Sequence, residues 1–113
     1  TYLHQIEAYE AATIAPELEP LRDRLKAMKE AYVKAVESVT ETKDNEYIDF
    51  QARRMVEMAG HIIMGHLLLA DTTRNESFRH SAEVYINFGE AEVTKHAAFI
   101  AHSKPEMMAD YRK

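Results

Sequence analysis

The stretch Tyr47–Asp71, YIDFQARRMVEMAGHIIMGHLLLAD, decides the fold, because it is the longest apolar segment of the 113-residue chain and contains no proline. Its apolar residues recur at alternating steps of four and three, which places them along one side of a helix. Charged residues occupy the other side of its first half. The apolar side is formed by Ile48, Ala52, Met55, Ala59, Ile62, His66 and Leu69. The pattern therefore predicts a long amphipathic helix at the centre of the fold.

The second half of this stretch, from Met58 to Ala70, loses its charged side. A helix that is apolar all round is surrounded by protein or by lipid. Spanning a bilayer core of roughly 30 Å takes about 20 apolar residues. The apolar part here is shorter and contains His61 and His66. We therefore expect no membrane span, and enough surplus apolar surface around Ile62–Ala70 that other protein covers it.

The same helical spacing predicts two helices upstream. A short one runs from Tyr2 to about Ile14, with Tyr2, Ile6, Tyr9 and Thr13 on one face, and the tyrosines are expected at the edge of the core with their hydroxyls in water. This helix ends because Pro16 pushes the preceding residue out of the helical region. The segment Pro16–Pro20 is expected to be a connector or a bent first turn. A long helix then starts at Pro20 and reaches Val39, since proline suits the first helical position.

Polar breaks separate the remaining helices. The break at Thr42–Asn45 is short, so the helices on its two sides should be antiparallel, and Asp44 or Asn45 should cap the central helix. Asn75 is expected to cap a last helix that ends near Ser103. Its predicted buried side is formed by Phe78, Ala82, Tyr85, Ile86, Gly89, Val93, His96, Phe99 and Ile100. The remaining tail, from Glu106, is either a docked turn or frayed.

Together these elements predict an all-α domain, an up-and-down four-helix bundle of one short and three long helices spanning residues 1–113. The 14 basic and 19 acidic residues give a net charge of -5 without a basic stripe, which argues against nucleic-acid binding and polybasic membrane binding. The absence of cysteine excludes disulfides and thiol catalysis. Because the chain begins with Thr1, we expect a cytoplasmic C-terminal fragment of a larger chain, although N-terminal processing or a disordered start are alternatives.

Three mid-helix glycines, Gly60, Gly65 and Gly89, each cost about 1 kcal/mol relative to alanine. Such a cost usually has a structural reason. We expect that these glycines lie on or beside the core and let two helix axes approach closely.

Histidines and carboxylates in the chain require a test for a metal site. Three Glu–His pairs stand four residues apart: Glu57 with His61, Glu76 with His80, and Glu92 with His96. Di-iron bundles instead need Glu-x-x-His on two helices, so we interpret these as surface charge pairs. His66 and Asp71 resemble one fragment of a hemerythrin site, but its companion pairs are missing. We interpret His66 as a core histidine hydrogen-bonded to a neighbour and predict no bound metal.

Two further interpretations concern catalysis. His61 and Gly65 are similar to the phosphoacceptor helix of histidine phosphotransfer domains, but Met64 stands where those domains place a lysine that steadies the phosphoryl group. A stand-alone phosphotransfer or binding module is therefore the alternative function. Glu92 lies near the buried side of the last helix, where a partly covered ion pair is favoured over a general base. We assign no catalytic, cofactor-binding or metal-binding residue.

The segments DNEYIDF (44–50), ARRMVEMAGHIIMGHLLLADTT (52–73) and FRHSAEVYINFGEAEV (78–93) resemble the C-terminal accessory domain of some bacterial acyl-CoA dehydrogenases. The similarity covers roughly Pro16 to Ile100 and rests on packing features rather than catalytic motifs. It implies a parent flavoenzyme of fatty acid metabolism that binds FAD, oxidises an acyl-CoA substrate with a glutamate base, and forms a homo-oligomer. No flavin-binding or catalytic motif matches this sequence, so the resemblance implies a non-catalytic domain that packs against the enzyme body or a neighbouring subunit.

Overall fold

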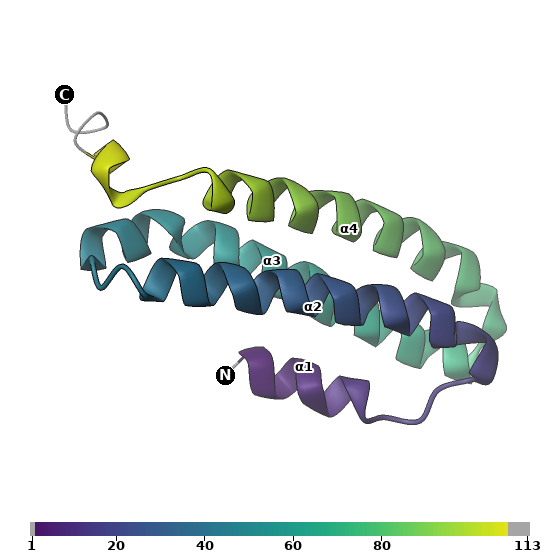
Figure 1. Cartoon of the computed structure of the whole chain (residues 1–113). Coiled ribbons are helices and arrows are strands. Elements are labelled where there is room, and N and C mark those ends of the chain that lie inside the picture. Colours follow the sequence, from purple (N-terminus) through teal and green to yellow (C-terminus); the bar gives the residue numbers. More distant parts are fainter. Residues whose placement is uncertain (1, 109–113) are drawn as a thin grey trace.

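The computed structural model describes residues 2–108 and confirms an all-α, up-and-down bundle of one short and three long helices. The helices are α1 (Tyr2–Glu10), α2 (Glu19–Thr40), α3 (Asn45–Arg74) and α4 (Arg79–Ala101). Single 3-10 turns separate or follow them: η1 (Pro16–Leu18), η2 (Glu76–Phe78) and η3 (Pro105–Met107). The three long helices pack against one another, and α1 lies along one half of the groove between α2 and α3 (Figure 1).

The start of α3 follows from its capping residue. The Asp44 carboxylate accepts a hydrogen bond from the Tyr47 backbone N–H at 3.1 Å, which satisfies one of the free amides of the first turn. Lys43, just before the cap, has a φ of 55°, so the backbone reverses in the left-handed region. This tight turn makes α2 and α3 antiparallel, as predicted.

The end of α3 lies beyond the predicted position at Asp71. The helix continues to Arg74, and the hydroxyls of Thr72 and Thr73 donate to the backbone carbonyls four residues earlier. These threonines satisfy their polar groups inside the helix, so the polar run does not break it. Asn75 then caps the η2 turn by accepting from the Ser77 N–H at 3.0 Å.

The first helix is shorter than predicted, because α1 ends at Glu10 rather than near Ile14. Ala15 is extended before Pro16, as expected, but the connector needs additional residues to cross from α1 to α2. The Ala15 N–H is 3.4 Å from the Thr73 hydroxyl, which links the connector to the end of α3. On the predicted apolar face of α1, Ile6 is fully buried, whereas Tyr2 at the start of the helix is exposed.

The core forms where the three long helices meet. Its largest fully buried side chains are Ile6, Leu18, Leu25, Met58, Ile62, Leu69, Ile86, Gln51, Val39 and Val93. Each long helix contributes at the predicted three- and four-residue spacing, so hydrophobic burial fixes how these helices are rotated, and α1 adds Ile6.

The last helix ends at Ala101, close to the predicted Ser103, and the chain turns back through η3. Met108 is buried, so the first part of the tail is docked. The rest of the predicted tail lies outside the described residues. Phe78 was predicted on the buried side of α4 and is exposed, because it belongs to the η2 turn rather than to the helix.

The three glycines differ in their surroundings. A Cβ on Gly65 would stand 2.5 Å from Leu25 Cδ2, so this residue lets α2 and α3 approach closely, as predicted. Gly89 is buried and a Cβ there would make ordinary contacts with His61 and Met28. The prediction was wrong for Gly60, which is exposed and where a Cβ would meet no neighbouring atom within 4 Å.

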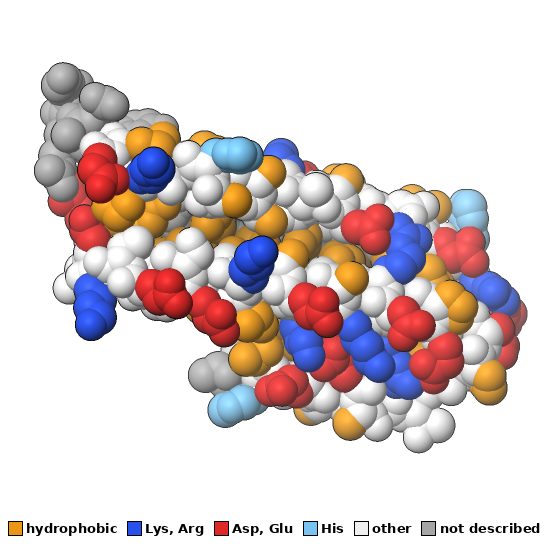
Figure 2. Space-filling model, in the orientation of Figure 1, with side chains coloured by type: hydrophobic (Ala, Val, Ile, Leu, Met, Phe, Trp, Pro, Cys, Tyr) orange, Lys and Arg blue, Asp and Glu red, His pale blue; other side chains and the backbone are white. Residues whose placement is uncertain are grey.

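The face that carries α2 mixes acidic and basic side chains along the helix, and hydrophobic side chains gather in the strip between α2 and α4 (Figure 2). A shallow groove in that strip is lined mainly by small residues of both helices, including Ala31, Ala35, Ala97 and Ala98. Across the described part of the chain, each helix is too short or too polar to cross a membrane.

Candidate functional site

The outward surfaces of α3 and α4 expose large apolar side chains, together called the apolar patch here, that this chain does not cover. On α3 the exposed fractions are 48% for Val56, 43% for Met64 and 38% for Leu67, and on α4 they are 53% for Val84 and 52% for Phe88. The predicted surplus of apolar surface around Ile62–Ala70 is thus confirmed at Met64 and Leu67. Large exposed apolar patches mark places where protein meets protein.

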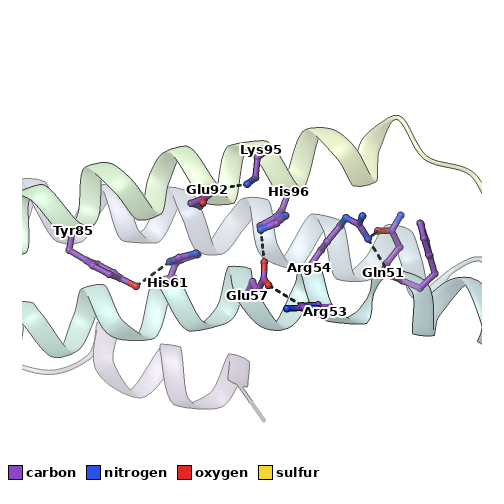
Figure 3. A network of polar contacts seen from close by, with 10 residues as sticks. Gln51, Arg53, Arg54, Glu57, His61, Tyr85, Glu92, Lys95 and His96 are labelled. Carbon is purple, nitrogen blue, oxygen red and sulfur yellow. Dashed lines mark hydrogen bonds and ion pairs between the residues drawn. The ribbon is translucent and has the colours of Figure 1, made fainter.

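Three aromatic rings join the two helices beside this patch. His61 of α3 lies edge-on to Phe88 at 5.5 Å between ring centroids, and Tyr85 lies about as close to both. The Tyr85 hydroxyl is 3.1 Å from His61 Nδ1 (Figure 3). Burial raises the pKa of Tyr85, so the phenol stays protonated at neutral pH and can donate to the imidazole.

Next to the rings, charged groups bridge α3 and α4. Glu57 Oε2 is 2.9 Å from His96 Nε2, and its other oxygen accepts from Arg53 at 3.3 Å (Figure 3). Glu92 pairs with Lys95 at 2.7 Å, and that hydrogen bond lowers the pKa of the Glu92 carboxyl. Glu92 is therefore the partly covered ion pair that the sequence predicted. A carboxylate held ionised beside a cation is a weak general base.

Towards the other end of this face, Arg54 is held by aromatic and polar contacts. Its guanidinium lies 3.9 Å from the centre of the Phe99 ring and 3.4 Å from Gln51 Oε1. The amide of Gln51, which is fully buried, donates to the Tyr47 hydroxyl at 3.2 Å. These contacts satisfy a buried amide and cover an aromatic ring, so their role is structural.

His66 lies on the opposite side of α3, under α1, where its ring stacks on Tyr9 at 6.0 Å between centroids. Burial lowers its pKa to about 4, a nearby Glu10 opposes this effect, and basic residues of α2 add to it. The core position was predicted correctly. The predicted hydrogen bond is not found at Nε2, which has no partner within the described structure.

The structure separates the Glu–His pairs of the sequence. Within residues 2–108, none of the three same-helix pairs forms a salt bridge, because Glu57 binds Arg53 and His96, Glu76 binds Arg79, and Glu92 binds Lys95. The interpretation as same-helix charge pairs is therefore wrong for Glu57–His61 and Glu76–His80. For the third pair, His96 adds to the effect of Lys95 in lowering the pKa of Glu92, so a weak electrostatic interaction remains. Over the same residues, no cluster of three or more potential metal ligands occurs.

His61 is also a poor match for a phosphoacceptor. Two aromatic rings flank it, and Met64, not a lysine, precedes Gly65. Nothing in this geometry supports the phosphotransfer alternative.

Sequence reasoning identified Met64 and Leu67 but missed the contribution of α4 to the patch. Val84 and Phe88 stand four residues apart on the side of α4 away from its core residues. Two apolar residues four positions apart on the otherwise polar side of a helix would have predicted this exposed apolar pair. A small hollow at this position is lined by His80, Ser81, Val84, Tyr85 and Phe88.

Comparison with known proteins identifies this bundle. The family model described as "Acyl-CoA dehydrogenase C terminal" matches residues 1–108. A solved structure, the acyl-CoA dehydrogenase family protein from Porphyromonas gingivalis, is 41% identical over 92% of this chain and 90% of that chain, with a TM-score of 0.87. No curated protein matches. The match is wider than the segments that carried the resemblance in the sequence, and it shows that the chain belongs to the acyl-CoA dehydrogenase C-terminal domain family.

Proposed function

We propose that this domain is a non-catalytic docking unit of an FAD-dependent acyl-CoA dehydrogenase, and that it packs against the enzyme body or a neighbouring subunit. The observation that carries the proposal is the apolar patch on α3 and α4. Leaving side chains such as Met64 and Phe88 in water forgoes roughly 25 cal/mol for each Å² of apolar surface that a partner would bury. Membership of the C-terminal domain family supports a partner within the same enzyme.

The polar groups of the domain support a structural rather than a catalytic role. Glu90 and Glu92 each lie beside a cation, and hydrogen bonds from Arg24 and Lys95 lower the pKa of these carboxyls. A general base works best when its pKa lies near the operating pH, and these two carboxyls are shifted the other way. We therefore place the base of the reaction in the rest of the enzyme.

The groove beside α1 is also poorly suited to FAD. The groove beside α1 has a volume of 780 Å³ and is lined by Tyr2, Leu3, Gln5, Tyr32, Val33, Val36 and Glu37. This lining contains no basic side chain that could neutralise a pyrophosphate. We accordingly propose that FAD and the acyl-CoA substrate bind to the enzyme body, in a cytoplasmic homo-oligomer of fatty acid metabolism.

A reconstitution experiment tests the docking role. The 113-residue chain is mixed with the dehydrogenase body encoded upstream in the same reading frame, and binding is measured by titration calorimetry, with flavin absorbance and acyl-CoA oxidation followed for each part. We expect the chain to bind the body and to show neither bound flavin nor turnover by itself. Flavin binding or acyl-CoA oxidation by the chain alone, or an upstream frame without a dehydrogenase body, would overturn the proposal.

A further inference from the structure

The solvent side of α3 carries a continuous row of residues, here called the outer stripe. Its members are spaced by three or four positions and stand opposite the core residues of the same helix. In chain order they are Asp49, Arg53, Val56, Gly60, Met64, Leu67, Asp71 and Arg74. The stripe is about 38 Å long at the helical rise of 1.5 Å per residue.

Gly60 at the middle of the stripe has no explanation within this chain. A mid-helix glycine costs about 1 kcal/mol relative to alanine. At Gly65 the cost has a structural reason, because the missing side chain leaves room for Leu25. At Gly60 there is no such reason, because an added Cβ would meet no atom of a neighbouring element within 4 Å. Because Gly60 has no side chain, a gap is left on the helix surface between the exposed Val56 and Met64. A large side chain of another helix could occupy this gap.

The order of charges along the stripe identifies the partner. From the N-terminal end, the stripe begins with Asp49 and Arg53, continues with four uncharged residues, and ends with Asp71 and Arg74. A second α3 laid antiparallel, with the centre of the pairing near Ile62, brings opposite charges together at both ends. Asp49 then faces Arg74 of the second copy, and Arg53 faces Asp71 of the second copy. A parallel pairing would instead place like charges together, which is destabilising.

The same register also matches shapes at the centre. Met64 of each copy lies over Gly60 of the other, and Val56 lies over Leu67. A methionine fits an irregular gap because its side chain is flexible, and glycine lets the helix axes approach closely. In the single chain, Arg53 and Arg74 pair with Glu57 and Asp71 at exposed positions, where such pairs contribute little, so exchanging partners costs little.

From this complementarity we propose that the outer stripe is a self-association surface, on which a second copy of the domain packs its α3 antiparallel, with Met64 seated on Gly60. The inference rests on the proposed docking role and specifies the neighbouring subunit as the partner of this face. On α4, Val84 and Phe88 are also exposed, and the Phe88 ring lies 5.5 Å from the His61 ring of α3, so we expect them to extend the apolar contact.

A charge-swap experiment on the 113-residue chain tests the pairing by sedimentation equilibrium. Arg53→Glu and Asp71→Arg should each weaken dimerisation at least tenfold, because each creates two like-charge contacts in a symmetric dimer. The double variant should restore the dimer to within about threefold of the original. The two positions are 18 residues apart, about 27 Å along one helix, so they cannot rescue each other within one copy. Lys34→Glu, an exposed reversal on α2, is the matched control and should have no effect.

Cross-linking provides a second test that does not depend on charge. Since the chain has no cysteine, chains carrying Val56→Cys and Leu67→Cys should form a disulfide when mixed. Neither should cross-link with itself, because two copies of position 56 would be roughly 17 Å apart in the antiparallel register, whereas a disulfide needs Cα atoms within about 7 Å.

Three results would overturn the inference. The chain could stay monomeric at millimolar concentration, or the double variant could fail to restore the dimerisation that each single variant weakens. Cross-linking of Val56→Cys with itself would be the third. Binding to the dehydrogenase body separates this failure from that of the docking role. A monomeric chain that still binds the body contradicts only the second-copy partner, whereas a chain that binds neither contradicts both.

Discussion

Gly65 of α3 lies directly against Leu25 of α2, so closely that a methyl group at position 65 would stand 2.5 Å from Leu25 Cδ2. Leu25 is fully buried, so it cannot move away without disturbing the core. The contact explains why a helix-weakening residue stands inside the longest helix. It also distinguishes Gly65 from Gly60, five residues earlier on the outer side of the same helix.

The two glycines should respond oppositely to the same substitution. Gly65→Ala should destabilise the domain by about 1–2 kcal/mol, because overpacking outweighs the gain in helix propensity. Gly60→Ala should stabilise it by roughly 0.5–1 kcal/mol, because nothing opposes that gain. Urea unfolding at low micromolar concentration measures both. A Gly65→Ala variant as stable as Gly60→Ala would contradict the packing described for α2 and α3.

The buried His66 should make the domain sensitive to mild acid. Burial lowers the folded-state pKa from 6.5 to about 4, Glu10 opposes this, and Arg22, Lys26 and Lys29 add to it. The unfolded chain therefore binds a proton first as the pH falls. The contribution of neutral His66 to the free energy of unfolding is fully present above about pH 6.5 and is lost as the pH falls towards 4. Between pH 7 and pH 5 the free energy of unfolding should fall by about 2 kcal/mol through this residue.

His66→Leu isolates this effect, because it removes the titrating group and leaves an apolar side chain in the same place. Urea unfolding at pH 7 and pH 5 should show a smaller loss for the variant, by about 2 kcal/mol. Other groups titrate equally in both proteins and cancel in the comparison. Equal losses in the two proteins would show that burial does not lower the pKa of His66.

The cap of α3 should contribute measurably to stability. Asp44→Ala removes the acceptor of the Tyr47 N–H and should cost about 1 kcal/mol, whereas Asp44→Asn retains an acceptor and should cost little. Thermal unfolding followed by circular dichroism compares the two variants. If alanine and asparagine proved equivalent at this position, the capping hydrogen bond would not be what stabilises the start of α3.

Much of this fold is predictable because its signals are local. The spacing of Ile62, Leu69 and their neighbours sets the buried side of α3, and the carboxylate of Asp44 marks where the helix starts. The end of α3 was missed because Thr72 and Thr73 look like turn residues until their hydroxyls bond back into the helix. Such hydrogen bonds depend on what lies beside the segment, and its composition does not reveal them.

The site was less predictable because it depends on which helices become neighbours. Glu57 was expected to pair with His61 along one helix, but the rotation of α4 brings His96 to its carboxylate instead. Gly60, in contrast, lies two positions before the buried Ile62, about 200° around the helix, so its outer position follows from the local spacing and was missed. Surplus apolar surface at Met64 was visible in the sequence because it exceeds what a single helix face can bury.

The central claim is that protein covers the outer face of α3 in the assembled enzyme. Alkylation of a cysteine at position 64 in the full-length enzyme tests it most directly, with Lys34→Cys as the exposed reference and peptide mass spectrometry to locate the label. Relative to each unfolded chain, Met64→Cys should react at least tenfold more slowly than Lys34→Cys. Equal rates at the two positions would show that the face is open to water and would contradict the account.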